Sequence, residues 1–361
     1  MNKILSLIIP AYNMEAYLPK CLGSLIVDDK ELLQKLDVIV VNDGSEDSTY
    51  EIAHGFESKY PGVFRVIDKP NGHYGSCINA ALPVVAGVFV KVLDADDSFD
   101  TGNLEILLAW MDGESDNLAK NKVDVVFTDM SKVNCDDKVT GCSNLLLPEG
   151  EPFSLDTIID VFPYGVVMHE IAYRVGVLRH INYRQLEGVC YTDTLWCFLP
   201  MANIRKGIYF PKSIYRYLLG REGQSADIKV VQKNLRMYMA VFEEMVRQYE
   251  LWCPKLPVCG VNYLRHQMML FLELLYRIAI FIPNIKDSVA KFDEIEKFLA
   301  GLSKEMYDLA GLVTITRKCK LRYVIYLRHL KYMQGAYILF LRLLKRAIGN
   351  IAMVRQLIMK K

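Results

Sequence analysis

Short apolar runs alternate with amphipathic segments through the first 130 residues of the chain. Five runs of strand-forming residues occur at 4–10, 36–41, 63–68, 88–93 and 123–128. Between the first two runs, apolar residues recur at the i, i+3 and i+4 spacing of one helix face, at Tyr17, Leu18, Cys21, Leu22, Leu25 and Ile26. Near-continuous apolar strands separated by helices are typical of a parallel sheet covered on both faces. This part of the chain is predicted to be an α/β domain with a mostly parallel, Rossmann-like sheet.

The pattern changes in the second half of the chain. Residues 150–225 are mixed and rich in Gly, Pro and Tyr, whereas the sequence beyond Asp227 has helical spacing almost throughout, as in 230–252. We therefore predict two domains, an α/β domain over 1–225 and a helical region over 226–361.

Charge is distributed unevenly along the 361 residues. The net charge is +1, yet residues 310–361 contain no Asp or Glu and 12 Lys and Arg. The first 309 residues then hold 31 basic and 42 acidic side chains, a net charge of about −11. An acidic body with a wholly basic tail predicts an anionic partner for the tail alone.

Neither the cysteines nor the apolar runs indicate export or a membrane span. The nine cysteines form no C-x-x-C pair, and their number is odd, which favours a reducing, cytoplasmic compartment. The apolar run before Pro10 is shorter than a signal-peptide core, and the run at 270–282 is short and contains Glu273 and Arg277. We expect a cytoplasmic protein without a spanning helix.

Polar residues follow three of the predicted strands, at 10–13, 42–45 and 94–97. Ligands of parallel α/β sheets bind beyond the carboxyl ends of the strands. Asp94, Asp96 and Asp97 supply the hard oxygen ligands that Mg²⁺ and Mn²⁺ prefer. Asp43 can accept a hydrogen bond from a base N–H, and Tyr12 offers a flat face to a base. Since the chain has neither G-x-G-x-x-G nor a Walker loop, we expect a nucleotide diphosphate held through a divalent metal ion.

Four segments in order resemble the inverting family 2 glycosyltransferases with the GT-A nucleotide-sugar fold. They are SLIIPAYNMEAYLPKCLGSL, VIVVNDGSEDST, NGHYGSCINAAL and VKVLDADD. The resemblance covers roughly 4–225. It implies that Asp43 binds the base, usually uracil, that Asp94 binds the ribose, and that Asp96 binds the metal ion. Pro10, Tyr12 and Asn79 fall on the remaining motif positions of the nucleotide-sugar site.

Two later segments extend the resemblance. LEGVCYTDTLWCF (186–198) is similar to the E-G-x-x-x-E-D segment, whose Asp is the general base, and Asp193 takes that position with Thr192 where Glu is usual. YLLGREGQSAD (217–227) is similar to the R-x-G-x-S segment over the diphosphate, which implies roles for Arg221 and Ser225. Two positions depart from the pattern: Ile78 replaces an Arg, and Asn42 replaces an Asp. His169 is expected to be structural rather than a ligand.

The predicted function is transfer of a hexose or N-acetylhexosamine from a nucleotide diphosphate sugar, most simply a UDP-sugar, to a hydroxyl of a saccharide or lipid-linked saccharide. One base, Asp193, and one displacement would invert the anomeric carbon, with Arg221 and the metal ion stabilising the leaving diphosphate. A sugar nucleotidyltransferase remains an alternative, although no Gly-rich loop follows the first strand. An inactive binding protein of the same fold is another, because of Ile78 and Thr192.

The basic tail has its own set of predicted partners. Residues 315–361 interleave Lys and Arg with large apolar side chains, as in a helix that lies on an anionic bilayer at the inner face of the membrane. Packing on the acidic body and contact with a second subunit in a homo-oligomer are alternatives. Nucleic acid is not expected, since no binding motif for it occurs.

Overall fold

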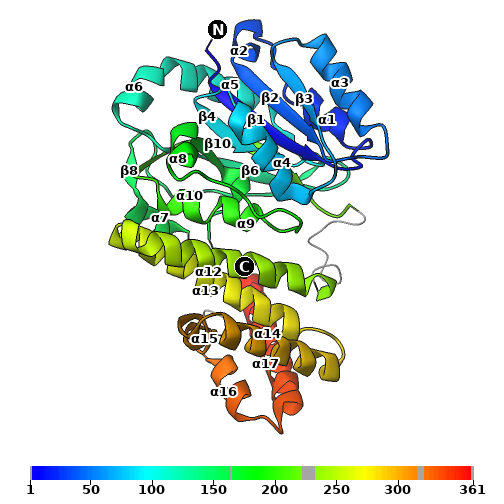
Figure 1. Ribbon diagram of the computed structural model, residues 1–361, viewed down its shortest axis with the longest axis vertical. Coiled ribbons are helices and arrows are strands. Elements are labelled where there is room, and N and C mark those ends of the chain that lie inside the picture. The colour runs from blue at the N-terminus through cyan, green and yellow to red at the C-terminus, as the bar shows by residue number, and fades with distance from the viewer. Residues whose placement is uncertain (1, 163–164, 222–231, 315–320, 359–361) are drawn as a thin grey trace. The chain divides into compact units, whose positions relative to one another are not determined.

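The computed structural model describes residues 2–162, 165–221, 232–314 and 321–358 (Figure 1). The chain divides into two compact units. The first contains Met1–Gln224 and Arg247–Leu264, and the second contains Ser225–Val246 and Arg265–Lys361. The division into domains at 225/226 stays a prediction.

The first half of the sheet is parallel, as the apolar runs predict. Strands β1 (Leu5–Ala11), β2 (Leu36–Asn42), β3 (Phe64–Asp68) and β4 (Phe89–Val92) stand in the order β3-β2-β1-β4. Every residue of β2 and β4 is buried, which is why these strands read as continuous apolar runs rather than as alternating ones. With β6 (Val125–Val133), all five predicted strands are confirmed.

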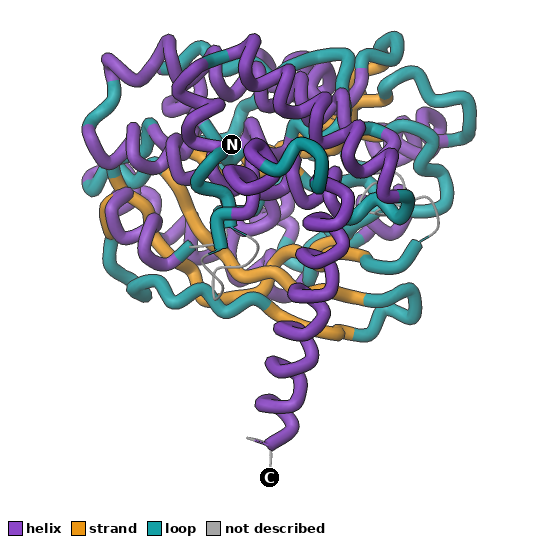
Figure 2. The backbone as a smooth tube through the Cα atoms, turned by 90° about the horizontal axis from the view of Figure 1, so that it is seen from below, coloured by secondary structure: helices purple, strands orange, loops and turns teal. Residues whose placement is uncertain are grey.

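The second half of the sheet is mixed, so the expectation of a mostly parallel sheet holds for β1–β4 and for β6 beside β10. Strand β9 (Ile171–Arg174) runs antiparallel between β4 and β6. It follows a short 3₁₀ turn, η2 (Met168–Glu170). Strand β10 (Lys206–Leu218) is parallel to β6 and antiparallel to β5 (Ser98–Phe99). Short strands β7 (Val139–Cys142) and β8 (Phe153–Ser154) pair at β6 and β10, and the strands form one twisted sheet (Figure 2).

Helices cover the sheet in the first unit. They are α1 (Leu18–Gly23), α2 (Lys30–Leu33), α3 (Thr49–Lys59), α4 (His73–Ala81), α5 (Thr101–Gly113), α6 (Ser115–Lys120), α7 (Leu155–Val161), α8 (Val175–His180), α9 (Asp193–Trp196) and α10 (Leu199–Ala202), with the 3₁₀ turn η1 (Leu82–Val84). Helix α1 ends at Gly23, three residues before the predicted apolar stripe ends. Leu25 lies just past the helix but is buried in the same core. The spacing of apolar residues therefore predicts which side chains are buried better than it predicts where the helix ends.

The remainder of the described chain is helical, as predicted. Its elements are α12 (Leu235–Trp252), η3 (Cys253–Lys255), α13 (Val258–Ile280), α14 (Ile285–Leu302), α15 (Lys304–Ala310), α16 (Tyr323–His329) and α17 (Gln334–Ile358). Asn284 caps the N-terminus of α14, and its side chain accepts hydrogen bonds from the backbone N–H groups of Lys286 and Asp287. Among the helices of the described ranges, none combines the length and the hydropathy that crossing a bilayer requires.

Candidate active site

The base-binding candidate Asp43 stands directly after β2 and is 3% exposed. Its Oδ1 accepts a hydrogen bond from Lys69 Nζ (2.5 Å) and another from the Gly72 backbone N–H (3.0 Å). Ser76 Oγ lies 3.4 Å from the same oxygen. The carboxylate is thus neutralised and fixed in direction by residues around the start of α4.

Two further carboxylates, Asp94 and Asp97, follow β4 and are each held by a tyrosine. The Tyr74 hydroxyl donates to Asp94 Oδ1 (3.0 Å), and the Tyr215 hydroxyl donates to Asp97 Oδ2 (2.6 Å). The Leu218 backbone N–H donates to the other oxygen of Asp97 (2.7 Å). Strand β10 therefore contributes two of the donors that fix Asp97.

Burial and mutual repulsion disfavour the charged forms of Asp94 and Asp97. Burial raises the pKa of Asp94 to about 7, and the neighbouring charges of Asp96 and Asp193 add to the effect, while Tyr74 and Arg221 oppose it. Burial also raises the pKa of Asp97. A cation bound next to such carboxyl groups stabilises their ionised forms.

Asp96 takes part in a different interaction. Its Oδ2 accepts a hydrogen bond from Arg221 Nε at 2.5 Å, and both side chains are mostly buried. The Arg221 guanidinium also lies over the ring of Tyr17, 5.5 Å from its centre. Arg221 is thereby placed beside the acidic cluster. Ser225, the other candidate of that segment, lies outside the described residues.

A histidine completes the acidic cluster. Asp94, Asp97 and His169 each offer a ligand atom, and these atoms lie within 4.8 Å of one another. Burial lowers the pKa of His169 to about 3, with a further contribution from the charge of Lys91, so the imidazole is neutral and retains a lone pair. Its Nδ1 is buried and has no hydrogen-bond partner among the described residues. Two carboxylates and a neutral imidazole suit a divalent metal ion.

The position of His169 depends on the buried Lys91 of β4. The Lys91 ammonium donates to the carbonyl oxygens of His169 (2.6 Å) and Ile171 (3.2 Å). The His169 ring packs edge-on against Tyr215, with ring centres 4.6 Å apart. Burial lowers the pKa of Lys91 to about 7. Sequence reasoning missed Lys91, because a lysine within an apolar strand carries little signal on its own. It expected His169 to be structural, whereas the structure groups its imidazole with Asp94 and Asp97.

The general-base candidate Asp193 begins α9. Its side chain is exposed, but neighbouring protein displaces part of its water and raises its pKa. It lies close enough to Asp94 and Tyr74 for its charge to raise the pKa of each of these groups. The structure therefore brings together Asp94, Asp96, Asp193 and Arg221, with Tyr74 among them.

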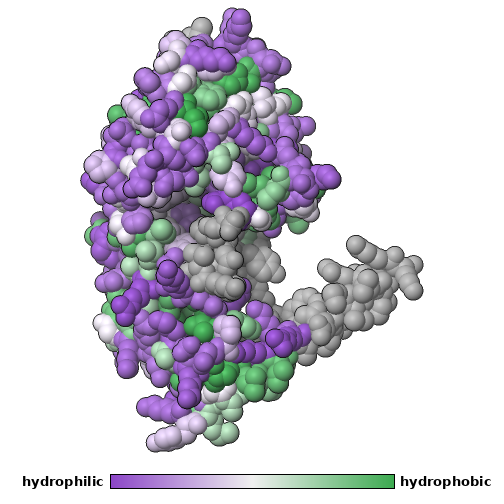
Figure 3. Space-filling model, turned by 90° about the vertical axis from the view of Figure 1, so that its right-hand side faces the viewer, coloured by the Kyte–Doolittle hydropathy of each residue, from purple (hydrophilic) through white to green (hydrophobic). Residues whose placement is uncertain are grey.

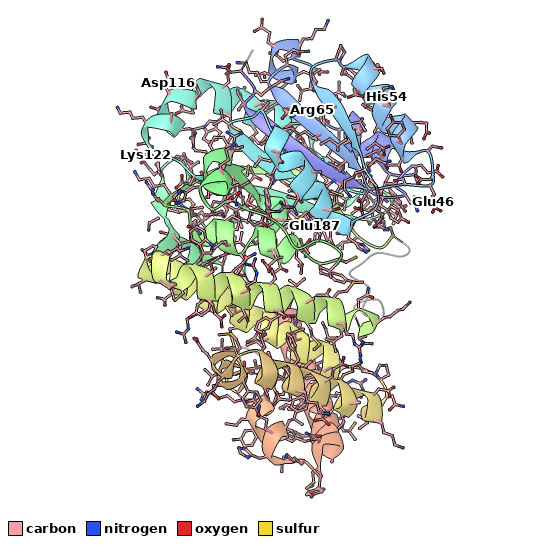
Figure 4. The ribbon with its side chains drawn as sticks, in the orientation of Figure 1. Glu46, His54, Arg65, Asp116, Lys122 and Glu187 are labelled. Carbon is pink, nitrogen blue, oxygen red and sulfur yellow. The ribbon has the colours of Figure 1, made fainter. Side chains whose placement is uncertain are left out.

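The loop that leads to Asp193 is fastened to α4. The Asn79 amide donates to the Gln185 carbonyl (2.9 Å) and to Glu187 Oε1 (2.7 Å), and it accepts from the Gln185 backbone N–H (2.8 Å). Glu187 is labelled beside α4 in Figure 4. Gly75 permits this approach, since a Cβ built there would lie 2.0 Å from the Leu186 carbonyl oxygen. In this structure Asn79 positions the loop.

The remaining sequence candidates lie at the end of β1. Pro10 is opposite Val41 of β2 and is partly buried. Tyr12 is 44% exposed, so its ring is open to solvent beyond the strand. The Asn13 backbone N–H donates to Ser45 Oγ (3.0 Å), and this bond joins the loops that follow β1 and β2.

One solved structure that matches this fold contains a nucleotide sugar. S. aureus TarS 1–349, in complex with UDP-GlcNAc, matches with a TM-score of 0.66 at 18% identity, over 92% of this chain and 89% of that chain. This likeness concerns the fold, and it extends over both the mixed sheet and the C-terminal helices. The fold that this likeness shows is GT-A-like, and carboxylates lie at the ends of its strands.

The sequence comparisons point to the same class of protein. Residues 6–136 match the model for glycosyl transferase family 2. The uncharacterized glycosyltransferase YibD of Escherichia coli K12 is 26% identical over 254 residues, 68% of this chain and 72% of that protein. Chondroitin synthase of Pasteurella multocida is 34% identical over 105 residues, 29% of this chain and 10% of that protein. A Mycoplasma pneumoniae relative named as an uncharacterized glycosyltransferase is 38% identical, and the match spans 32% of its length.

Proposed function

We propose that this protein transfers a hexose or N-acetylhexosamine from a UDP-sugar to a hydroxyl of a saccharide or lipid-linked saccharide, with inversion of the anomeric carbon. One observation carries the proposal: Asp193, a carboxyl with a raised pKa, lies beside the Asp94–Asp96–Arg221 group. This combination offers a proton acceptor and a cationic partner for a leaving diphosphate within one site. The match of residues 6–136 to the model for glycosyl transferase family 2 supports the same reaction class.

In this proposal the donor nucleotide lies across the ends of β1, β2 and β4. Asp43 accepts a hydrogen bond from the uracil N–H, and the exposed ring of Tyr12, next to Pro10, covers the base. Asp94 accepts a hydrogen bond from the ribose. Arg221 exchanges its contact with Asp96 for the diphosphate, where its charge stabilises the departing oxygens. Ser225 is assigned to the diphosphate by its sequence motif alone.

Asp193 then acts as the general base. It takes the proton of the acceptor hydroxyl while that oxygen attacks the anomeric carbon, and the bond to the diphosphate oxygen breaks. A pKa raised towards the working pH improves a carboxylate as a proton acceptor. The attacking and leaving oxygens are on opposite sides of the sugar in a single displacement, which accounts for inversion.

A divalent cation, Mn²⁺ or Mg²⁺, would be held by Asp94, Asp97 and His169, with Asp96 beside it. When bound, the cation would neutralise charge on the diphosphate of the donor. The orphaned Nδ1 of His169 and the raised pKa values of Asp94 and Asp97 favour this assignment.

The proposed cellular setting is cytoplasmic. The eight cysteines in the described part of the chain are all free, which agrees with a reducing, cytoplasmic compartment. Homo-oligomerisation stays a prediction.

Calorimetric titration of UDP and GDP, each with Mn²⁺ or with a chelator, tests the donor site. We expect UDP to bind with Mn²⁺, and to bind much more weakly to Asp94→Asn. Asp116→Asn is the matched control, because Asp116 lies on α6 and is exposed (Figure 4). Asp193→Asn should bind UDP normally and fail to release UDP from any UDP-sugar that the wild type hydrolyses or transfers. If a folded wild type binds neither nucleotide, the proposal is wrong, and the inactive-protein alternative is favoured.

A further inference from the structure

Helices α16 and α17 and the turn between them expose an unusual number of large apolar side chains. Met333 is 60% exposed, Leu339 51%, Phe340 50% and Leu343 55%. Tyr326 and Tyr332 are exposed as well. We call these six residues the α16–α17 apolar surface. Figure 3 shows apolar side chains grouped at the surface in the lower part of the view, where α17 begins.

This surface is continuous. The Tyr337 ring lies between those of Tyr326 and Phe340, with ring centres 6.2 Å and 5.8 Å away, so that α16 and α17 are joined by a row of three rings. Leu339, Phe340 and Leu343 follow one another at helical spacing on the same side of α17.

Core packing does not explain these residues, because α17 already has a buried apolar face. Ile338 and Leu341 are fully buried and supply that face. A surface helix of a globular unit needs one apolar face, and α17 has a second one that is open to solvent. An exposed second face of this kind indicates a binding surface.

Basic side chains predominate around the surface, although Glu296 of α14 pairs with Arg328 and lines a pocket with Asp293 and Lys331. The sequence contains no acidic residue after Asp308, and it contains 12 basic residues over 310–361. Lys331 and Arg346, on either side of the surface, are exposed. The other basic groups near it are engaged within the unit: Arg342 donates to backbone carbonyls, among them that of Pro283 (3.1 Å), and Lys345 lies 4.1 Å from the centre of the Phe281 ring.

We propose that the α16–α17 apolar surface docks on an anionic lipid bilayer. Tyrosines and apolar side chains flanked mainly by cations match the layered chemistry of a bilayer surface, in which apolar chains lie beneath anionic headgroups. Each nearby Lys or Arg adds to the attraction. An isologous contact with a second copy would instead bring two positive surfaces together. The docking does not depend on the proposed reaction.

Sedimentation of the full-length protein with vesicles tests the proposal. The vesicles contain either phosphatidylcholine alone or phosphatidylcholine with 30% phosphatidylglycerol. We expect partitioning onto the anionic vesicles and little onto the neutral ones. The double variant Leu339→Asn/Phe340→Asn should bind the anionic vesicles at least tenfold more weakly. Its matched control, Leu146→Asn/Val258→Asn, alters two exposed apolar residues elsewhere and should bind as the wild type does.

A charge variant separates the two contributions. Lys331→Glu/Arg346→Glu should also lose at least tenfold in binding, and added salt should weaken wild-type binding. Lys30→Glu/Lys120→Glu, which reverses two exposed lysines of the first unit, is the control. Absence of wild-type binding, or equal binding by wild type and both tail variants, would overturn the proposal. So would a wild-type dimer in light scattering that Leu339→Asn/Phe340→Asn dissociates while vesicles stay unbound. UDP binding should be unchanged in both tail variants, which keeps this test separate from that of the donor site.

Discussion

Gly75→Ala should disable turnover while leaving the fold and the donor site intact. A Cβ at this position would lie 2.0 Å from the Leu186 carbonyl oxygen, whereas real contacts of this kind are rarely shorter than about 3.0 Å. Either α4 or the 185–193 loop must then move by about 1 Å. Helix α4 contacts β1 and β2 of the sheet, so the loop is expected to move, and Asp193 with it.

The expected size of the effect follows from that displacement. Misplacing a catalytic group by about 1 Å can reduce the rate roughly 10²-fold. Forcing an added methyl group into a packed site costs about 1–3 kcal/mol of stability. The assays are UDP release under saturating UDP-sugar and acceptor, thermal unfolding, and calorimetric UDP binding. We expect turnover to fall about 10²-fold, with UDP affinity within a few-fold of wild type.

Gly55→Ala is the matched control. Gly55 lies in α3, and a Cβ there would meet nothing within 4 Å. The change should leave turnover unaltered and raise stability by about 0.5–1 kcal/mol, because alanine is the better helix residue. If Gly75→Ala folds and turns over like Gly55→Ala, the loop does not control the position of a catalytic Asp193, and our reasoning about that loop is refuted.

Three further predictions concern the same site. The affinity for Mn²⁺ should rise as the pH increases through about 7, because the buried Asp94 must lose its proton to bind a cation, and its pKa lies near 7; calorimetry at pH 6, 7 and 8 would show a flat response if this is incorrect. Tyr74→Phe removes a hydrogen bond that lowers the pKa of Asp94, so the same affinity curve should shift to higher pH. Mn²⁺ affinity at pH 7 should drop about 10- to 150-fold, which corresponds to the 1.5–3 kcal/mol that a charged hydrogen bond contributes. Lys91→Met leaves two buried carbonyls without their donor and should weaken Mn²⁺ binding by displacing His169; unchanged affinity in a folded variant would mean that His169 is not a ligand.

The strands and the strand-end carboxylates are predictable because they depend on short-range pattern. Buried parallel strands leave continuous apolar runs, and Asp43 and Asp94 are placed by coming directly after two of them. The carboxyl ends of parallel strands lie at the same edge of the sheet, independently of the conformation of the loops that follow them. The family motifs then add Asp193 and Arg221, which the structure also brings to this edge.

The partners of these carboxylates could not be read from the sequence. His169 reaches Asp97 through the antiparallel addition of β9, and Tyr215 reaches it from a strand 118 residues further on. Such pairings depend on strand order and register, which local spacing does not record. The exposed apolar side of α17 could not be predicted either. The helical spacing of its apolar residues does not tell which of them are buried in the folded unit and which remain exposed.

The position of β10 late in the sequence determines when, during synthesis, the protein can first bind its donor. The Asp97 donors lie 118 and 121 residues beyond it, and Arg221 lies 125 residues beyond Asp96. A nascent chain that has just left the ribosome with β1–β4 complete would hold clustered carboxylates with their distant donors not yet made. Pairing of β10 with β5 and β6 closes that gap in one late, long-range step, which is slow in folding terms. Donor binding should therefore be acquired only when the last strand of the sheet has emerged, and a released fragment ending before residue 206 would be unable to compete for UDP-sugar.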